Sequence, residues 1–138
     1  MMEEMKERLT MEGLLAVLGG GMYLANLGNR EFRDFLAQRQ GVAEIRTLDR
    51  NVARRFLISH GSLRVARGSH PCPDYAIVYK DAAEAVAVMS KGSQEAALQS
   101  ITEGKMWIEG DLEFGMWFND LLQKTGELLK QPKNLIKL

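Results

Sequence analysis

Few residues in this sequence combine the types and the spacing that catalysis or metal binding requires. The two histidines, His60 and His70, stand at separate turns, and no cysteine or carboxylate lies at a metal-ligand offset from either one. Each directly follows a serine, Ser59 or Ser69. Sequence neighbours are wrongly placed to act as a nucleophile and its base, and no Gly-x-Ser-x-Gly elbow is present. We therefore expect neither a metal site nor a serine-histidine catalytic site.

The single cysteine, Cys72, lies between two prolines and cannot form an internal disulfide. A chain without a disulfide framework suits a reducing compartment. No neighbouring motif would activate this thiol as a nucleophile, so we interpret Cys72 as a loop residue.

Two further motifs lack the residues that would make them reactive. Gly104-Lys105 has neither the upstream glycine nor the downstream serine or threonine of a phosphate-binding loop. The carboxylates of Glu109, Asp111 and Glu113 cluster nearby, but capping and the dipole of a helix N-terminus explain them. The sequence therefore predicts a protein that is not an enzyme and that holds no metal or cofactor. Its function must then come from binding.

The composition narrows the class of partner. A chain of 138 residues with 46% hydrophobic content suits one globular domain. Lys+Arg and Asp+Glu are 18 each, and this balance argues against nucleic acid as a partner. The charge is uneven, however: residues 30–67 hold nine Arg against four acids, net +5, and residues 124–138 hold four Lys and one Glu, net +3. These stretches fit either a solvated sheet face or transient contact with an anionic membrane surface.

The N-terminal segment resembles neither a secretory signal nor a membrane span. Residues 1–8 mix acids and bases, so we expect an intracellular, cytoplasmic protein. Residues 11–27 are largely apolar but contain Glu12, Asn26 and Gly19-Gly20-Gly21, whereas a span needs about 20 steadily apolar residues. A helix pair or a broken helix on the core is the expected structure. The glycines fit a plain loop between two helices, or a close backbone approach to a ligand.

The rest of the chain reads as an ordered series of amphipathic elements. Apolar spacing predicts a helix over residues 29–40, and period-two alternation predicts strands over 42–48, 52–59 and 62–68. In the second of these, Phe56 and Ile58 share the face that we expect to point inward. The remaining predicted elements are a strand over 74–80 with both faces buried, a helix capped by Asp81, a helix over 93–100, a strand over 104–109 and a helix over 112–130.

The last helix carries unusual aromatic mass. At 100° per residue, its apolar side chains fall in one arc of about 140° with the charged residues opposite. Ordinary core packing explains such an arc, and so does the wall or lid of a binding cavity. The arc consists of Phe114, Trp117, Phe118, Leu121, Leu122, Thr125, Leu128 and Leu129.

The strand that precedes this helix reads Gly104-Lys105-Met106-Trp107-Ile108-Glu109-Gly110-Asp111. A Gly-Lys strand that turns through Gly-Asp into an apolar helix resembles the sterol carrier protein 2 (SCP2) family. The elements from residue 74 to residue 130 follow that family's order, and the resemblance extends over about residues 30–130. It implies an α+β fold: a five-stranded, mostly antiparallel sheet covered on one side by helices, with a hydrophobic cavity. Residues 1–29 would then be an apolar helical extension and residues 30–138 the SCP2-like lipid-binding domain.

The resemblance also implies a function: non-catalytic binding and transfer or presentation of a lipid-like ligand, such as a sterol, fatty acyl, phospholipid or prenyl chain. An accessory module with a filled core that docks a partner enzyme, in lipid or isoprenoid-quinone metabolism, is the alternative. Trp107 points to the other face of its strand, where we expect the N-terminal extension to cover it. The C-terminal tripeptide Ile136-Lys137-Leu138 has a bulky residue where a peroxisomal signal needs a small one, so we expect no such address. The expected lipid-binding residues are Phe56, Ile58, Ile77, Leu98, Ile101, Met106, Ile108, Phe114, Trp117, Phe118, Leu121 and Leu122.

Overall fold

A computed structural model describes residues 1–136 of the chain. Lys137 and Leu138 lie outside the described residues, and with them most of the C-terminal tripeptide considered above. The predicted order of strands and helices is confirmed, with a short C-terminal 3₁₀ helix as an addition. The elements are α1 (Met2–Gly28), α2 (Arg30–Leu36), β1 (Gly41–Thr47), β2 (Ala53–Ser59), β3 (Ser62–Arg67), β4 (Tyr75–Tyr79), α3 (Ala82–Lys91), α4 (Gln94–Thr102), β5 (Met106–Gly110), α5 (Leu112–Lys130) and η1 (Pro132–Asn134).

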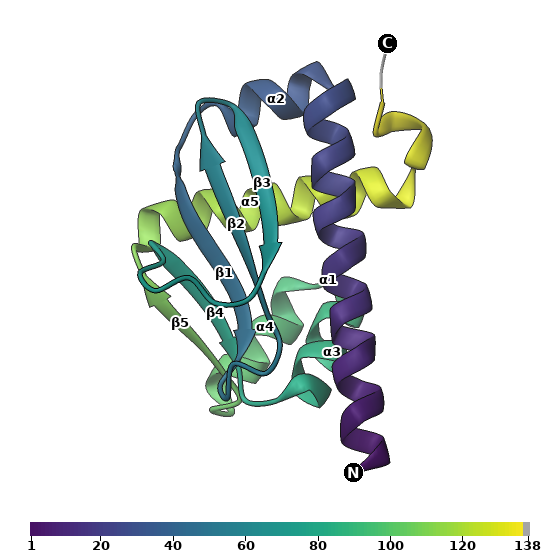
Figure 1. The fold of residues 1–138 in the computed structure, drawn as a ribbon, viewed down its shortest axis with the longest axis vertical. Helices are drawn as coiled ribbons and strands as arrows, with labels where there is room; N and C mark the ends of the chain where they lie inside the picture. Colours follow the sequence, from purple (N-terminus) through teal and green to yellow (C-terminus); the bar gives the residue numbers. More distant parts are fainter. Residues whose placement is uncertain (137–138) are drawn as a thin grey trace.

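The five strands form one sheet with the order β3-β2-β1-β4-β5. Three neighbouring pairs are antiparallel, and the central pair of β1 and β4 is parallel. The prediction of a mostly antiparallel five-stranded sheet is therefore confirmed. The parallel pair arises because the chain leaves β3 at one edge of the sheet and crosses to enter β4 beyond β1 (Figure 1).

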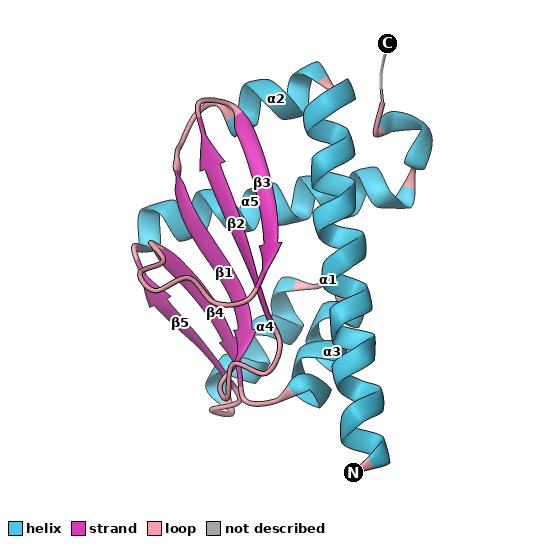
Figure 2. Cartoon of the chain, viewed as in Figure 1, coloured by secondary structure: helices cyan, strands magenta, loops and turns pink. Residues whose placement is uncertain are grey.

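The helices gather on one face of the sheet, as Figure 2 shows. Alternate side chains of the strands point into that helical layer and form the core. In β2 these are Phe56 and Ile58, both almost fully buried, which confirms their predicted orientation. In β4 they are Tyr75, Ile77 and Tyr79, and the intervening residues of β4 are buried as well. Both faces of β4 are therefore covered, as the sequence predicts.

On the opposite face of the sheet, the connection from β3 to β4, residues 68–74, lies over part of β1. Its backbone N–H at His70 donates a 2.6 Å hydrogen bond to Oε1 of Glu44, a fully buried β1 residue. Arg46 lies beside Glu44, with 3.1 Å between its Nε and the carboxylate Oε2, and also reaches Glu109 at 3.5 Å. A buried charge needs such a partner. The loop thus seals an ion pair against the sheet.

The predicted break at the triple glycine is wrong, because α1 runs uninterrupted from Met2 to Gly28. A Cβ on Gly19 would lie 2.9 Å from Val65 of β3, and a Cβ on Gly21 would lie 2.9 Å from Leu129 of α5. Gly20 points away from the protein, with no atom within 4 Å of its would-be Cβ. Two of the three glycines are therefore needed for close packing of a continuous helix rather than for a loop.

A charged contact fixes α1 to the sheet. The carboxylate of Glu12 lies 3.3 Å from Arg54 of β2 and 2.6 Å from Arg67 of β3. Together with Arg46, these arginines show that part of the basic stretch over residues 30–67 is paired with carboxylates of the same chain. Within residues 1–136, no helix is both long enough and apolar enough to cross a membrane.

Candidate functional site

The inner face of α5 lies against the sheet, where the site was predicted. Asp111 caps the helix, because its carboxylate accepts the backbone N–H groups of Glu113 and Phe114 at 2.9 and 3.2 Å. From this fixed start, the arc read from the sequence turns toward the core. Trp117 is 7% exposed and Phe118 is fully buried, so the aromatic part of the arc lies inside the protein.

Six aromatic side chains meet there, and we call them the aromatic cluster. Phe118 lies against Phe56 and Tyr75, with ring centroids 5.4 and 6.2 Å apart. Trp117 stacks on Phe35 of α2 at 5.6 Å with an interplanar angle of 12°, and lies 5.5 Å from Phe114. The stacked pair Trp117–Phe35 and the edge-on pair Phe118–Tyr75 have preferred aromatic geometries, each contributing roughly 0.5–1.5 kcal/mol beyond burial. The cluster joins α2, α5, β2 and β4 into one apolar interior.

Two polar groups lie within this apolar interior. The indole Nε1 of Trp117 is buried and has no hydrogen-bond partner among the described residues. The Tyr75 hydroxyl accepts a long 3.4 Å hydrogen bond from Nδ2 of Asn119, and burial raises the pKa of Tyr75 above its usual 10.0. An unpaired buried donor costs about 1–3 kcal/mol. The cluster therefore contains one donor whose hydrogen-bonding capacity the protein does not use.

Most of the predicted lipid-binding residues come together at this interior. Leu98 and Ile101 do not, since they are 63% and 39% exposed. Their helix α4 turns Ala96, Ala97 and Ser100 inward instead, which places both larger side chains on the outer surface. Ile108 and Leu122 are half-buried against the core. The buried members are Phe56, Ile58, Ile77, Met106, Phe114, Trp117, Phe118 and Leu121.

The sequence analysis did not predict three residues that form or border the aromatic cluster. Phe35 and Tyr75 were assigned to amphipathic elements but not to the site. Gly115 lies where α5 meets β4, and a Cβ there would overlap the edge of the Tyr75 ring. A glycine within an otherwise strong helix pattern is the signal that could have indicated this close approach.

Trp107 is not covered by the N-terminal segment, and that prediction is wrong. It is 39% exposed on the face of the sheet away from the helices, opposite Val78 of β4 in the strand register. Helix α1 packs against α2, α3, α5 and β3 on the other side. The alternation of β5 therefore places this indole out of reach of α1.

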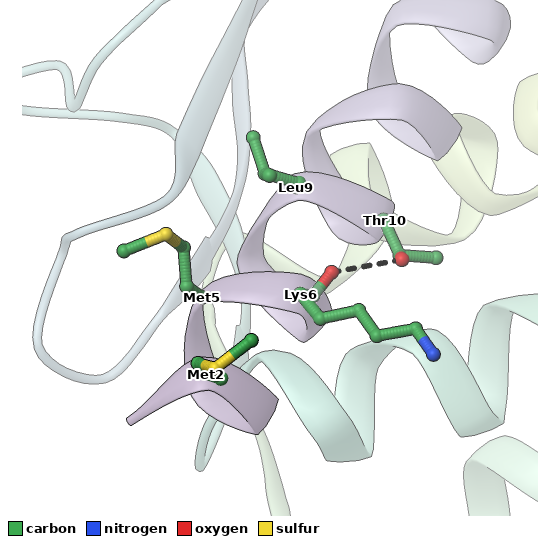
Figure 3. Close-up of a pocket in the computed structure, with 5 residues that line it drawn as sticks. All are labelled: Met2, Met5, Lys6, Leu9 and Thr10. Carbon is green, nitrogen blue, oxygen red and sulfur yellow. Dashed lines mark hydrogen bonds between the residues drawn. The ribbon is translucent and has the colours of Figure 1, made fainter.

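Two of the hollows on the surface of the described chain involve its helices. One of about 390 Å³ lies at the start of α1 and is lined by Met2, Met5, Lys6, Leu9 and Thr10 (Figure 3). The other, of about 430 Å³, lies between α2, α5 and η1. No strand residue lines either hollow, so neither is the cavity expected between sheet and helices. That cavity stays a prediction.

Within the described residues, no group of three or more His, Cys, Asp or Glu side chains is arranged to hold a metal ion. Cys72 is a free, exposed thiol.

Comparison with known proteins gives one consistent result. No protein-family model matches the sequence, and no curated protein shows a significant match. Solved structures do match: a UbiJ-SCP2 ubiquinone synthesis protein is 15% identical with a TM-score of 0.54, over 86% of this chain and 92% of that one. A crystal structure of sterol carrier protein 2 is 14% identical with a TM-score of 0.55, over 80% and 93% of the two chains. Sterol carrier protein 2 from Yarrowia lipolytica, in its apo form, is 11% identical with a TM-score of 0.54, over 78% and 88%.

These identities are too low to transfer an activity, but the shared topology spans nearly the whole of each matched structure. The α+β architecture and its expected family resemblance are confirmed at the level of the fold. The chain has a sterol carrier protein 2-like fold.

Proposed function

We propose that the protein binds a lipid-like molecule between α5 and the sheet, without catalysis, and presents or transfers it. The unpaired indole N–H of Trp117 inside the aromatic cluster carries this proposal. The names of two structurally similar proteins, both sterol carrier protein 2, support it. The ligand would enter as α5 moves away from the sheet and the rings of the cluster separate.

Such a site would bind mainly through apolar contact. Burial of an acyl or prenyl chain contributes roughly 0.8 kcal/mol per CH₂, so affinity needs few polar contacts and specificity would be broad. A hydroxyl or carbonyl oxygen of the ligand would accept the N–H of Trp117. This contact would orient the polar end and satisfy a group that is otherwise costly to bury.

The first test is native mass spectrometry of the freshly purified chain, followed by solvent extraction. The protein is then offered oleic acid, cholesterol, phosphatidylcholine and a long-chain ubiquinone. Uptake of any of these at one per chain supports carriage. A clean apo mass against the whole panel contradicts it.

Substitution of Trp117 tests whether the ligand binds at the aromatic cluster. Trp117→Phe keeps an aromatic ring but removes the N–H, and it should weaken oleic acid binding about three- to tenfold, as expected for the loss of one hydrogen bond. Leu98→Ala is the matched control, because Leu98 lies exposed on α4. In a Trp107→Phe background, the fluorescence of Trp117 reports ligand entry directly. Equal affinity of all variants would place the ligand elsewhere.

The alternative function is an accessory module that docks an enzyme. The close ring contacts of Phe118 with Phe56 and Tyr75 favour it, since they describe a filled interior. One similar structure is named a ubiquinone synthesis protein, so the enzyme would act on an isoprenoid quinone or its precursor. Hydrogen exchange separates the two functions: a carrier needs α5 to open more often than the sheet, whereas a filled module protects both equally.

A further inference from the structure

The outer face of α1 is apolar along the whole helix and is covered by nothing in the described chain. Its large exposed side chains recur at helical spacing on the side opposite Met11, Leu15 and Met22, which pack inward. Lys6 and Thr10 are polar neighbours on this stripe, and both line the hollow of Figure 3. The exposed apolar residues are Met2, Met5, Leu9, Val17, Tyr23 and Leu27, each between 53% and 87% exposed.

The size of this face is that of a protein interface. At roughly 200 Å² for a fully exposed large side chain, the six residues expose on the order of 700 Å². The largest apolar patch of an ordinary monomer is about 300–600 Å², and a stable complex uses about 800 Å² on each partner. With 27 residues, α1 is roughly 40 Å long. The face therefore exceeds the largest apolar patch of an ordinary monomer and approaches one side of a stable interface, and it is long enough for a whole helix to pack along it.

Two glycines in the middle of the face leave room for a close neighbour. The would-be Cβ atoms of Gly13 and Gly20 have no atom within 4 Å, unlike those of Gly19 and Gly21 on the inner side. Each glycine costs about 0.5–1 kcal/mol relative to alanine inside a helix. The described chain offers no packing reason for them. Close approach of a second helix backbone is such a reason, and a lipid surface is not.

The charges at the two ends of α1 favour one relative orientation of two packed α1 helices. Glu3 and Glu4 lie in its first turn, Glu4 being 3.6 Å from Arg8 of the same helix, and the exposed Arg30, next to Glu31, follows its C-terminal end. Two copies packed in parallel would bring the acids together. Antiparallel packing brings acids beside Arg30 and opposes the helix dipoles. The acidic first turn is also poorly suited to an anionic membrane.

We propose that the outer face of α1 binds a second copy of this chain, with the two α1 helices antiparallel about a twofold axis near Ala16. Gly13 of each copy then lies opposite Gly20 of the other. The sheet and the other helices pack on the inner side and the flanks of α1, with Leu129 of α5 beside Gly21 and Val65 of β3 beside Gly19, so a pairing along the outer face leaves the aromatic cluster accessible. Val17 and Leu9, exposed in the single chain, become buried in the pair. The pairing is reversible, so the dimer fraction depends on concentration.

Sedimentation equilibrium of the full chain, from about 1 to 100 μM, tests this pairing. Wild type should shift from monomer to dimer in that range. Gly20→Leu should raise the dissociation constant at least tenfold while leaving the melting temperature of the monomer unchanged or higher, because leucine favours a helix more than glycine. Gly126→Ala is the matched control, since Gly126 of α5 also has open space around it, and it should not alter association.

Cross-linking tests the direction in a Cys72→Ser background. Chains carrying Gly13→Cys should form disulfides with chains carrying Gly20→Cys and little with themselves. A monomer at all concentrations overturns the proposal. A monomer that floats with vesicles of phosphatidylcholine and phosphatidylglycerol also overturns it and assigns the face to a lipid surface. Preferential Gly13→Cys self-linking overturns the antiparallel arrangement.

Discussion

Replacing Gly115 by alanine would make a methyl group overlap the edge of the Tyr75 ring, where α5 crosses β4. In an open helix the same change gains about 1 kcal/mol. Here Tyr75 is 2% exposed and its ring is held edge-on to Phe118 at 6.2 Å, so neither side can give way freely. Overpacking of a core costs about 1–3 kcal/mol. Because the overlap with the ring is so close, we expect an overpacking cost at the upper end of this range. After the gain in helix propensity, the net loss in the free energy of unfolding is about 2 kcal/mol.

Urea unfolding followed by far-UV circular dichroism measures this loss as a lower midpoint at an unchanged m-value. For a chain of this length the melting temperature should fall by about 6–8 °C. Gly126→Ala supplies the control on the same helix: with nothing within 4 Å of the new methyl group, it should stabilise the protein by about 0.5–1 kcal/mol.

A second substitution separates the ring contact from other effects at this position. In a Tyr75→Leu background, Gly115→Ala should cost less than in wild type, because the obstructing ring is gone. The difference should be about 1–2 kcal/mol. If Gly115→Ala is as stable as wild type, or costs the same with and without the Tyr75 ring, the close approach of α5 to β4 is wrong.

Three further changes test other contacts. Glu12→Gln leaves the guanidinium of Arg54 without its carboxylate and should cost about 2–3 kcal/mol in urea unfolding; a loss below about 0.5 kcal/mol would mean that the ion pair does not hold α1. Asn29→Ala removes both the α2 cap and the side-chain bond to the carbonyl of Asn134, and should cost about 2 kcal/mol, with faster hydrogen exchange in η1; unchanged exchange would contradict that second role. Burial raises the pKa of Tyr79 far above its usual 10.0, so its stabilising effect is complete below about pH 10 and is lost as the pH rises further. Tyr79→Phe should therefore flatten the alkaline fall in melting temperature, and an equally steep fall would argue against this burial.

The order of the elements could be predicted because it depends on local patterns. Phe56 and Ile58 alternate with polar residues, and the pleat of a strand turns that alternation into an inner and an outer face. Asp81 and Asp111 are good caps, and their carboxylates do accept backbone N–H groups at the predicted helix starts. The aromatic arc of α5 follows from the helical period alone.

The failures share a cause, since each depends on contacts distant in sequence. Gly19 and Gly21 read as a break because local propensity disfavours glycine in a helix, but the packing of Val65 and Leu129 outweighs it. The burial of Glu44, which no local pattern indicates, likewise depends on a later loop that lies over it.

The misplaced site residues show the same limit. The last helix was correctly oriented because its apolar arc is long. Helix α4 has only nine residues and offers two competing apolar sides, one with Leu98 and Ile101 and one with small residues. The sequence favours the larger side chains, while the space available beside α3 and β5 accepts the smaller ones. Shape rather than hydrophobicity decides this orientation.

The continuous helix α1 also affects how the chain is made. It is translated before the segments that it packs against: its inner face packs on Val65 and Leu129, and Asn29 at its end bonds to a carbonyl 105 positions later. At about 5–20 residues per second, the last of these partners follows roughly 5–20 s after α1 itself. During that interval the inner face of the helix lacks at least one of its packing partners. The speed of the ribosome therefore sets how long each nascent chain presents this incompletely packed apolar helix to chaperones and to its neighbours on the same message.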